Sequence, residues 1–534
     1  MTSTSKSEQQ IDYDTLPLSV PFPEKCSTSS PAHEHPTIGL IGMGAMGRMY
    51  ANALGAAGWK KIHVCDVPEK YEQLKQDYQN SPNVTVLPDG HAVSRSSDFI
   101  VYSVEAEFIE RVVKQYGPST KMNAIVAGQT SVKAPEKVAF ENYLPKDVHI
   151  VSCHSLHGPS VSPVGQPLIL IKHRGSSATL ALVETILRPL KSRFVYLTYE
   201  EHDLVTANTQ AVTHAAFLSM GTAWSSTRSY PWEQGLYVGG IETAKVNLTL
   251  RIYSNAWHVY AGLAILNPKA REQIERYASS ATELFKMMLE GGNGGEEERR
   301  RFRERVAWAK ERVFGALEGE AGGKEGEGRR RPILLSEDLL DRFSLSASSP
   351  VTPTGPSATS TAADTNTSTQ TYPPSPHVAP PRKHRANSHL SLLTMVDCWA
   401  HLGINPYNHL DLAATPLFRL FLGVAEYLFL SPGPSRTSSS TSTSTSSTTS
   451  PPTTQTPLEA SLHSALHDTW HRSDDLEFVC AARGWSQAVS FGSFEVYRRR
   501  FEETRAFFEV TGRFGEVGRV GGEMIKAVMD SEVS

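Results

Sequence analysis

The sequence predicts an α/β domain with a doubly wound, mostly parallel sheet, followed by an α-helical domain that is interrupted by disordered insertions. Three observations predict this order. From Thr37 to about Leu197, short β-branched runs alternate with helix-like stretches, as in the βαβ units of a parallel sheet. From Glu200 to Leu289, long apolar stripes with few breakers indicate helices. Further along, tracts of Ser, Thr and Pro separate the remaining helical segments.

Composition limits the class of protein. A chain of 534 residues exceeds what one hydrophobic core usually organises, so we expect at least two domains. The net charge of −4 creates no field that would attract nucleic acid or an anionic membrane. The five cysteines are odd in number and far apart, which suits a reducing compartment. Neither a long apolar run nor an N-terminal targeting pattern is present, so we expect a cytoplasmic protein that binds neither nucleic acid nor membrane.

Shifts in composition predict the domain boundaries. Residues 1–36 are expected to be a disordered tail and 37–198 a nucleotide-binding domain. The helical domain is expected over 199–345, with a flexible, charged stretch at 291–331, and to continue at 386–431 and 458–534. The tracts 346–385 and 432–457 cannot bury enough apolar surface to offset chain entropy, and we expect both to be disordered.

A glycine-rich turn follows the first predicted strand. The run TIGLIGMGAMG starts at Thr37, and a helix pattern follows it. In such a turn, Gly42 permits the tight bend, Gly44 lets a pyrophosphate approach the backbone, and Gly47 lets helix and strand pack closely. The exposed amides at the start of the helix would hold the anion. The pattern predicts a Rossmann-type dinucleotide site. Its expected cofactor-binding residues are Gly42, Met43, Gly44, Ala45, Met46 and Gly47.

The residues leave the identity of the dinucleotide open. Asp66 ends the second predicted strand, and a carboxylate there accepts the ribose 2′-hydroxyl of NAD and repels the 2′-phosphate of NADP. Four nearby cations could instead bind that phosphate. They are Arg48, Lys60, Lys61 and Lys70. The local chemistry is therefore compatible with either cofactor.

Polar or glycine residues stand at the carboxyl ends of the predicted strands. They are Gly42, Asp66, Ser103, Ser131 and His154. In an open parallel sheet these ends meet at the ligand crevice, so we expect the reaction centre there, with Ser103 on the cofactor side.

Two histidines lie three residues apart in SCHSLHGPS. A metal site would need further ligands, and none stands at a suitable spacing, so we expect no metal. His154 either caps a turn or, in the interpretation that we favour, faces the nicotinamide. There an imidazole with an ordinary pKa of about 6.5 can take a hydroxyl proton while hydride leaves the same carbon. His157 is expected to position substrate or to shape the turn.

Two predicted helices carry polar faces where apolar residues would be usual. The first face comprises Thr206, Gln210, Thr213 and His214. The second comprises Asn247, Arg251, Ser254 and His258, with Lys245 just before it. Arg251 either forms a surface or dimer-interface ion pair or clamps a substrate carboxylate, a role that suits guanidinium geometry.

Longer motifs allow comparison with known families. They are GQTSVK at 128–133, HSLHGP at 154–159, YLTYEEHD at 196–203, TQAVTHAAFLSMG at 209–221, LRIYSNAWHVYAGLAILNP at 250–268 and TPLFRLFLGVAEYLFL at 415–430. Residues 37–430 and 474–526, which contain these motifs, closely resemble fungal prephenate dehydrogenase. The resemblance covers nearly every segment expected to be ordered and skips the low-complexity tracts.

The resemblance implies an activity. It implies the oxidation of prephenate, with loss of carbon dioxide, to 4-hydroxyphenylpyruvate in tyrosine biosynthesis. It also implies NADP⁺ as the acceptor, whereas Asp66 on its own favours NAD. An imidazole base and an orienting hydroxyl suit this chemistry, because the cofactor carries the difficult step.

The resemblance also implies residue roles. His154 matches the catalytic histidine of related bacterial enzymes, although Ser155 replaces the proline that follows it there. Ser131 matches the serine of their glycine-serine motif, and His214 matches a histidine on their first long helix. The substrate site is expected to hold His214, Arg251, Lys245, His157 and Gln210, with Arg251 the first choice and Lys245 the second for the substrate carboxylates. A homodimer is implied by resemblance alone.

Two other functions compete with this interpretation. A β-hydroxyacid dehydrogenase of the 6-phosphogluconate-dehydrogenase-like group would share GLIGMGAMG, and Lys245 with Asn247 could supply its lysine–asparagine pair. That group lacks HSLHGP, and its glycine-rich substrate loop is not found here. A non-catalytic NADP-sensing module should have lost its acid–base residues, whereas His154 and Ser131 are both present.

Overall fold

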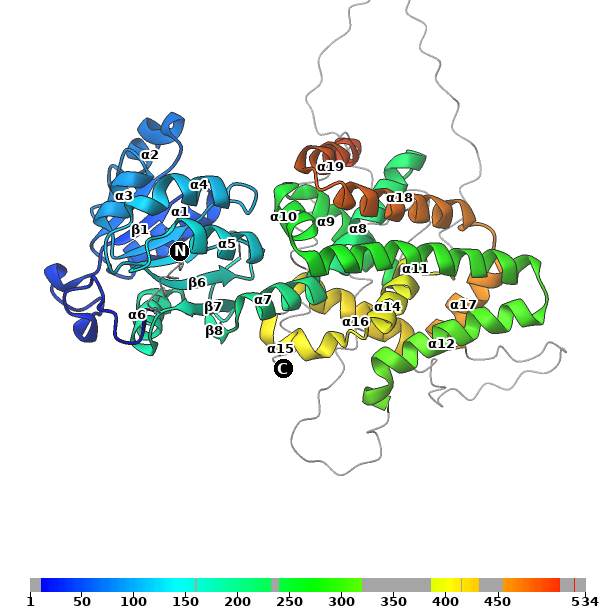
Figure 1. Cartoon of the computed structure of the whole chain (residues 1–534). Helices are drawn as coiled ribbons and strands as arrows, with labels where there is room; N and C mark the ends of the chain where they lie inside the picture. The colour runs from blue at the N-terminus through cyan, green and yellow to red at the C-terminus, as the bar shows by residue number, and fades with distance from the viewer. Residues whose placement is uncertain are drawn as a thin grey trace, which may run out of the picture.

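The computed structural model describes residues 11–158, 161–230, 232, 240–318, 386–413, 415–431, 455–509 and 523. These residues form an α/β domain and an α-helical domain that lie side by side (Figure 1). The helix α7 (Tyr199–Thr206) follows the last strand and leads into the helical domain. The predicted order, α/β and then all-α, is confirmed.

The α/β domain is built on one eight-stranded sheet with the order β3-β2-β1-β4-β5-β6-β7-β8. Its strands are β1 (Ile38–Ile41), β2 (Ile62–Cys65), β3 (Val84–Val86), β4 (Phe99–Tyr102), β5 (Ile125–Gly128), β6 (His149–Ser155), β7 (Pro167–Arg174) and β8 (Arg193–Tyr196). β1 pairs in parallel with both β2 and β4, so the strand order reverses at β1. The ligand crevice of such a sheet lies at this reversal, beyond the carboxyl ends of the strands.

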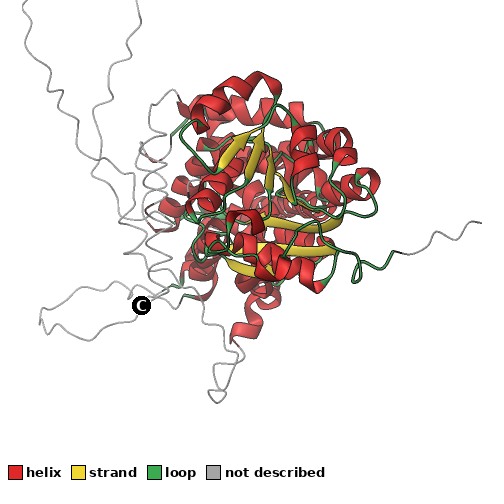
Figure 2. Ribbon diagram, turned by 90° about the vertical axis from the view of Figure 1, so that its left-hand side faces the viewer, coloured by secondary structure: helices red, strands yellow, loops and turns green. Residues whose placement is uncertain are grey.

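Helices cover both faces of the sheet (Figure 2). Leu54 of α1 and Ile186 of α6 lie in the core on one face. Val113 of α4 and Phe140 of α5 lie in the core on the other. The helices of this domain are α1 (Ala45–Ala56), α2 (Tyr71–Tyr78), α3 (Gly90–Ser96), α4 (Ile109–Tyr116), α5 (Ala134–Tyr143) and α6 (Ser177–Leu187). The sheet is doubly wound, as the sequence predicts.

The sheet is not parallel throughout, which corrects the sequence-based expectation. β7 pairs antiparallel with β6, so that His154 lies opposite Ile169. A parallel pair would need a crossover, usually a helix, and the described residues between Ser155 and Pro167 contain none. This pairing makes HSLHGP the start of a reversal rather than of a crossover.

The helical domain surrounds one long helix. Its elements are a π-helical turn (Ala207–Ala211), α8 (Val212–Thr227), α9 (Gly240–Ser254), α10 (His258–Leu266), α11 (Pro268–Asn293), α12 (Glu296–Glu318), α14 (Leu390–Leu402), α15 (Leu410–Ala413), α16 (Pro416–Leu430), α17 (Pro457–His467), α18 (Arg472–Ser490) and α19 (Phe494–Glu509). α11 packs against α12, α14 and α18. The Asn267 side chain caps it by accepting from the amides of Lys269 and Ala270. No helix in the described ranges is both long and apolar enough to cross a membrane.

The charged stretch expected to be flexible over 291–331 is helical as far as residue 318, so this expectation was wrong for 291–318. Arg300 pairs with both Glu297 and Glu304, at 2.7 and 2.6 Å, and such pairs one turn apart support a helix. On the opposite face, Phe302 and Val306 are buried in the core. The charges thus form the solvated face of an amphipathic helix. The remainder, 319–331, lies outside the described residues.

The N-terminal segment was expected to be a disordered tail, but residues 11–36 pack on the α/β domain. Val20 and Cys26 are buried in its core. The hydroxyl of Ser19 donates to Asp98 at 2.9 Å, and the carbonyl of Pro17 pairs with a ring nitrogen of His149 at 3.0 Å. A few apolar residues between polar ones are enough to hold the segment on the sheet domain. The low-complexity tracts at 346–385 and at 432–454 lie outside the described residues.

Candidate active site

The glycine turn after β1 provides an open helix N-terminus. Gly42 has φ +99°, a left-handed conformation that favours glycine. A Cβ at Gly47 would collide with the carbonyl of Gly42, so this position needs the absence of a side chain for packing. A Cβ at Gly44 would meet nothing within 4 Å. No side chain caps α1, so its first amides are available to an anion, as the sequence predicts.

Asp66 is held in the glycine turn. Its Oδ2 accepts the amide of Met43 at 3.1 Å and its Oδ1 accepts the amide of Val67 at 2.8 Å. The Nζ of Lys70, an exposed side chain, lies 3.5 Å from Oδ2. Asp66 therefore stabilises the turn, and a cation stands beside it.

Two of the other cations near Asp66 are occupied. Arg48 pairs with Asp77 at 2.8 Å and donates to the carbonyl of Met43. Lys61 donates to the carbonyls of His33 and His35. Lys70 is thus better placed than these two to meet a cofactor phosphate at the end of β2.

Ser103 lies beside the same turn. Its carbonyl stands against Gly42, and its hydroxyl donates to the side-chain oxygen of Gln129 at 2.8 Å. This bond joins the end of β4 to the end of β5. The residues that the sequence placed at the carboxyl ends of neighbouring strands are therefore brought together.

The GQTSVK segment folds around a buried ion pair. The Lys133 ammonium lies 2.8 Å from the Glu136 carboxylate, and both side chains are fully buried. The same ammonium donates to the carbonyls of Gly128 and Cys153, and Glu136 accepts from the hydroxyl of Thr130 at 2.6 Å. This network ties the loop after β5 to the strand that carries His154.

His154, at the end of β6, belongs to a row of three side chains. Its Nδ1 lies 2.7 Å from the Nε2 of His202, and the Nδ1 of His202 lies 2.9 Å from the Oδ1 of Asp203. The carboxylate of Asp203 also accepts the backbone amides of Lys133 and Ala134, at 2.7 and 2.8 Å. The row therefore joins β6, α7 and the start of α5.

Both histidines of this row are neutral at rest. Burial lowers the pKa of His154 well below its ordinary value, and the nearby His202 and Lys133 lower it further. Burial and Lys133 likewise lower the pKa of His202. Burial raises the pKa of Asp203 to about 6, against the opposing effect of two amides. Near neutral pH, an ionised Asp203 thus stands behind two neutral imidazoles.

Helix α10 closes the other side of the crevice. A Cβ on Gly262 would lie 3.8 Å from the hydroxyl of Ser131 and 3.3 Å from Ala106. His258 at the start of α10 lies 3.5 Å from the carboxylate of Glu105. In the part of the chain that the structure describes, the Ser131 hydroxyl makes no hydrogen bond, so it is available to a ligand between the two domains.

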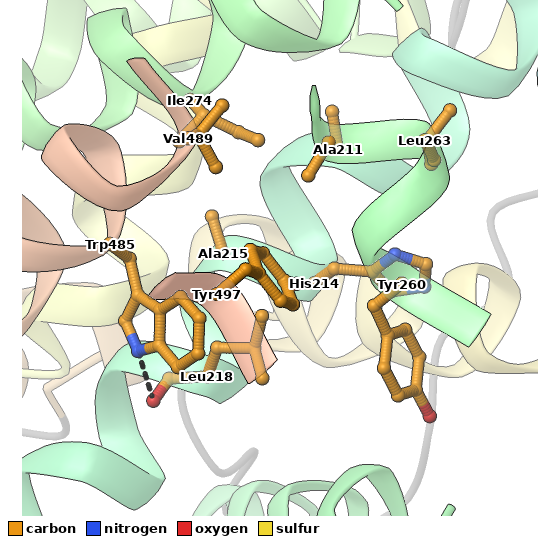
Figure 3. Close-up of a pocket in the computed structure, with 11 residues that line it drawn as sticks. Ala211, His214, Ala215, Leu218, Tyr260, Leu263, Ile274, Trp485, Val489 and Tyr497 are labelled. Atoms are coloured by element: carbon orange, nitrogen blue, oxygen red, sulfur yellow. Dashed lines mark hydrogen bonds between the residues drawn. The ribbon is translucent and has the colours of Figure 1, made fainter. Parts of the chain in front are cut away.

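His214 lies in an apolar pocket of the helical domain, where its ring meets that of Tyr260 edge-on at 4.9 Å (Figure 3). Burial lowers the pKa of His214 to about 4. The pocket is lined further by Ala211, Ala215, Leu218, Leu263, Ala264, Ile274, Trp485, Val489 and Tyr497. The charge of Arg251 acts on the Tyr260 hydroxyl, whose pKa burial nevertheless raises to about 12. The structure thus brings His214, Tyr260 and Arg251 together.

The remaining predicted substrate residues lie in different surroundings. Lys245 is buried and pairs with Glu242 at 3.0 Å, which makes it less suited than Arg251 to a substrate carboxylate. Gln210 is half-buried in the π-helical turn. A ring nitrogen of His157 pairs with the carbonyl of Gly158 at 3.0 Å, which is a turn contact.

Two fungal proteins are similar over almost the whole chain. The probable prephenate dehydrogenase (NADP⁺) of Schizosaccharomyces pombe is 45% identical over 497 residues, which cover 92% of this chain and 98% of that protein. The prephenate dehydrogenase (NADP⁺) of Saccharomyces cerevisiae is 45% identical over 495 residues, which cover 92% of this chain and 94% of that protein. This chain belongs to their family. The resemblance that the sequence motifs predict is confirmed.

Family models match both domains of this member of the fungal prephenate dehydrogenase family. Residues 211–450 and 452–530 match a model of the 6-phosphogluconate dehydrogenase C-terminal domain. Residues 37–127 match the coenzyme F420-dependent NADP oxidoreductase model. Among solved structures, prephenate dehydrogenase from Aquifex aeolicus is 24% identical, with a TM-score of 0.30 over 34% of this chain and 68% of that one.

Sequence reasoning missed four residues around the site, namely Lys133, Glu136, His202 and Asp203. All four lie in or beside motifs used for the resemblance, but no role was assigned to them. One local signal was available. Thr198 and Glu201 form a capping box that starts α7, which marks His202 as a helix residue rather than a loop residue.

Proposed function

We propose that the chain is an NADP⁺-dependent prephenate dehydrogenase, which converts prephenate to 4-hydroxyphenylpyruvate and carbon dioxide in tyrosine biosynthesis. One observation carries the proposal at the level of chemistry. A neutral imidazole, His154, stands at the carboxyl end of β6, and its Nδ1 is bonded to His202, which leaves Nε2 for a substrate. The names of the two fungal relatives support the same activity.

The residues at the glycine turn fit the cofactor. The uncapped start of α1 and the open space at Gly44 suit the pyrophosphate. Lys70 beside Asp66 suits a 2′-phosphate, because it supplies a positive charge where Asp66 alone would repel one. NADP⁺, when bound, supplies the acceptor for the hydride of the substrate.

His154 and Ser131 act on the hydroxyl at C4 of prephenate. His154 takes the hydroxyl proton on Nε2 while the C4–H bond breaks, and Ser131 donates a hydrogen bond to the same oxygen. The carbonyl that forms at C4 then accepts the electron pair of the bond between C1 and the carboxylate. Carbon dioxide leaves, the ring becomes aromatic, and the C4 oxygen regains a proton.

The substrate carboxylates need cations on the other side of the crevice. Arg251, near Tyr260 and His214, is the residue that we propose for this role, because guanidinium binds carboxylate in a bidentate manner. His214, neutral near pH 7, would line the site rather than contribute a charge. Gln210 and His157 remain proposed contacts from the helical domain and from the turn after β6.

The test is a spectrophotometric assay of cofactor reduction with prephenate, run with NADP⁺ and with NAD⁺. His154→Asn should lower kcat by on the order of 10²–10⁴-fold with little change in KM. The matched control is His173→Asn on the neighbouring strand β7, an exposed histidine that contacts Glu141. Arg251→Ala should chiefly raise the KM for prephenate. Unchanged turnover in His154→Asn would remove this residue from the mechanism.

We further propose that the chain is a homodimer in the cytoplasm. The dimer is supported only by family resemblance. The compartment is supported by the five cysteines, all free, four of them buried. Light scattering after size exclusion should give twice the mass of one chain, and the mass of a single chain would contradict the dimer.

A further inference from the structure

The row His154–His202–Asp203 fixes the positions of its protons. Asp203, ionised near neutral pH, can only accept, so the Nδ1 of His202 carries the proton that lies between them. The Nε2 of a neutral His202 is then an acceptor, and the Nδ1 of His154 must donate to it. The Nε2 of His154 is left without a proton. The row thus presents the basic tautomer of His154 to the crevice.

A proton on His154 would be costly if it stayed there. The ring is 9% exposed, and the Lys133 ammonium nearby disfavours a second positive charge. His202 is fully buried as well, but its Nδ1 lies 2.9 Å from the carboxylate of Asp203. A positive charge is therefore better stabilised on His202 than on His154.

We propose that His202 and Asp203 complete a proton relay with His154, and that the proton taken from the substrate hydroxyl is stored as an ion pair between His202 and Asp203. The proposal rests on the proposed function, in which His154 is the base.

The steps of the relay balance. The proton of the substrate hydroxyl moves to Nε2 of His154, and the proton on Nδ1 of His154 moves to Nε2 of His202. His154 ends neutral in its other tautomer, while His202 becomes an imidazolium that donates from Nδ1 to Asp203. The reverse steps return the proton after the product leaves. His202 and Asp203 act through His154 and are positioning residues.

The amides behind Asp203 make the relay rigid. The amides of Lys133 and Ala134 hold both carboxylate oxygens, and the side chain of Asn267 donates to the carbonyl of Asp203 at 2.8 Å. These bonds come from the start of α5 and from the start of α11. The carboxylate is therefore fixed from both domains at the point where the crevice lies.

The test compares His202→Gln with a matched control on the same helix. A glutamine can accept the hydrogen bond from His154 but cannot carry the proton. We expect kcat to fall by roughly 10–100-fold, with the KM for prephenate within about twofold of the parent. The control is Thr206→Val, a buried residue whose hydroxyl donates only to carbonyls of its own helix, and its kcat should stay close to the parent.

Two further measurements separate a relay from a structural role. In the double variant His154→Asn/His202→Gln, the residual rate should equal that of His154→Asn alone, because His202 acts only through His154. In Asp203→Asn, the acidic limb of the kcat profile should move to lower pH, since the pair loses its counter-charge. The other titratable groups around the row are Lys133 with Glu136, and His157.

The outcomes distinguish the two proposals. Multiplicative losses in the double variant, or a kcat and pH profile of His202→Gln equal to those of Thr206→Val, would overturn the relay. If His154→Asn retained turnover, the proposed function would lose its base, whatever His202 does. If His202→Gln unfolds at a lower temperature, the acidic limb of Asp203→Asn, measured on folded protein, still decides.

Discussion

The buried ion pair beneath the GQTSVK loop gives the sharpest test of the structural reasoning. Lys133→Met removes an ammonium that makes five hydrogen bonds, two to Glu136 and one each to Gly128, Ser152 and Cys153, at 2.8–3.1 Å. Glu136 would remain fully buried, with only hydroxyl groups and an amide to stabilise it. Breaking a buried pair in this way costs about 3–5 kcal/mol. In a domain of this size, that is a fall in Tm of roughly 6–20 °C.

Thermal unfolding followed by circular dichroism measures this effect. The control is Lys137→Met, the same substitution one turn further along α5, where the lysine pairs with Glu200 near the surface. Loss of such a pair costs about 0.2–1 kcal/mol. The double variant Lys133→Met/Glu136→Gln should be more stable than Lys133→Met alone, because no unpaired charge is left inside. Equal melting temperatures for Lys133→Met and Lys137→Met would refute the argument.

Three further predictions concern the cofactor site and the helical pocket. Gly44→Val should keep the parent Tm but weaken NADP⁺ binding, measured by titration, whereas Gly47→Ala should lower the Tm because its Cβ meets the neighbouring turn. Lys70→Ala should raise the KM for NADP⁺ more than that for NAD⁺; equal changes would remove Lys70 from phosphate recognition. The pKa of His214 is lowered to about 4, so its contribution to stability is present above the unfolded value of about 6.5 and is lost as pH falls toward 4. His214→Phe should therefore flatten the decline of Tm with falling pH in that range.

Much of the α/β domain could be predicted because its signals are local. The glycine turn, the short apolar strands and the polar residue that follows each strand can be recognised within about ten residues of sequence, and parallel pairing then brings those polar residues to one edge. Ser103 and Gln129 meet in this way. β7 could not be placed by such rules, because its pairing with β6 depends on how the chain reverses after Ser155.

The relay residues escaped prediction because their partners are distant in the chain. Position 202 is 48 residues beyond His154, and the contact exists only because α7 returns to the end of β6. Ser155 is a similar case. The sequence shows only that a serine replaces a proline after the histidine, whereas the structure shows its hydroxyl 2.8 Å from that of Tyr50 on α1. The roles of Ser131, Arg251 and the other site residues stay predictions.

Asp66 shows why a local rule for cofactor choice can mislead. The rule takes a carboxylate after the second strand as an acceptor for a ribose hydroxyl, and it assumes that the carboxylate faces the ribose without other partners. Here each oxygen of Asp66 already accepts a backbone amide, one of them from the glycine turn itself. Its charge is offset by Lys70 at 3.5 Å, an exposed cation on the next turn of chain. A 2′-phosphate approaching this edge would meet the ammonium of Lys70 together with a carboxylate whose oxygens are already engaged, so the presence of Asp66 does not oppose NADP⁺.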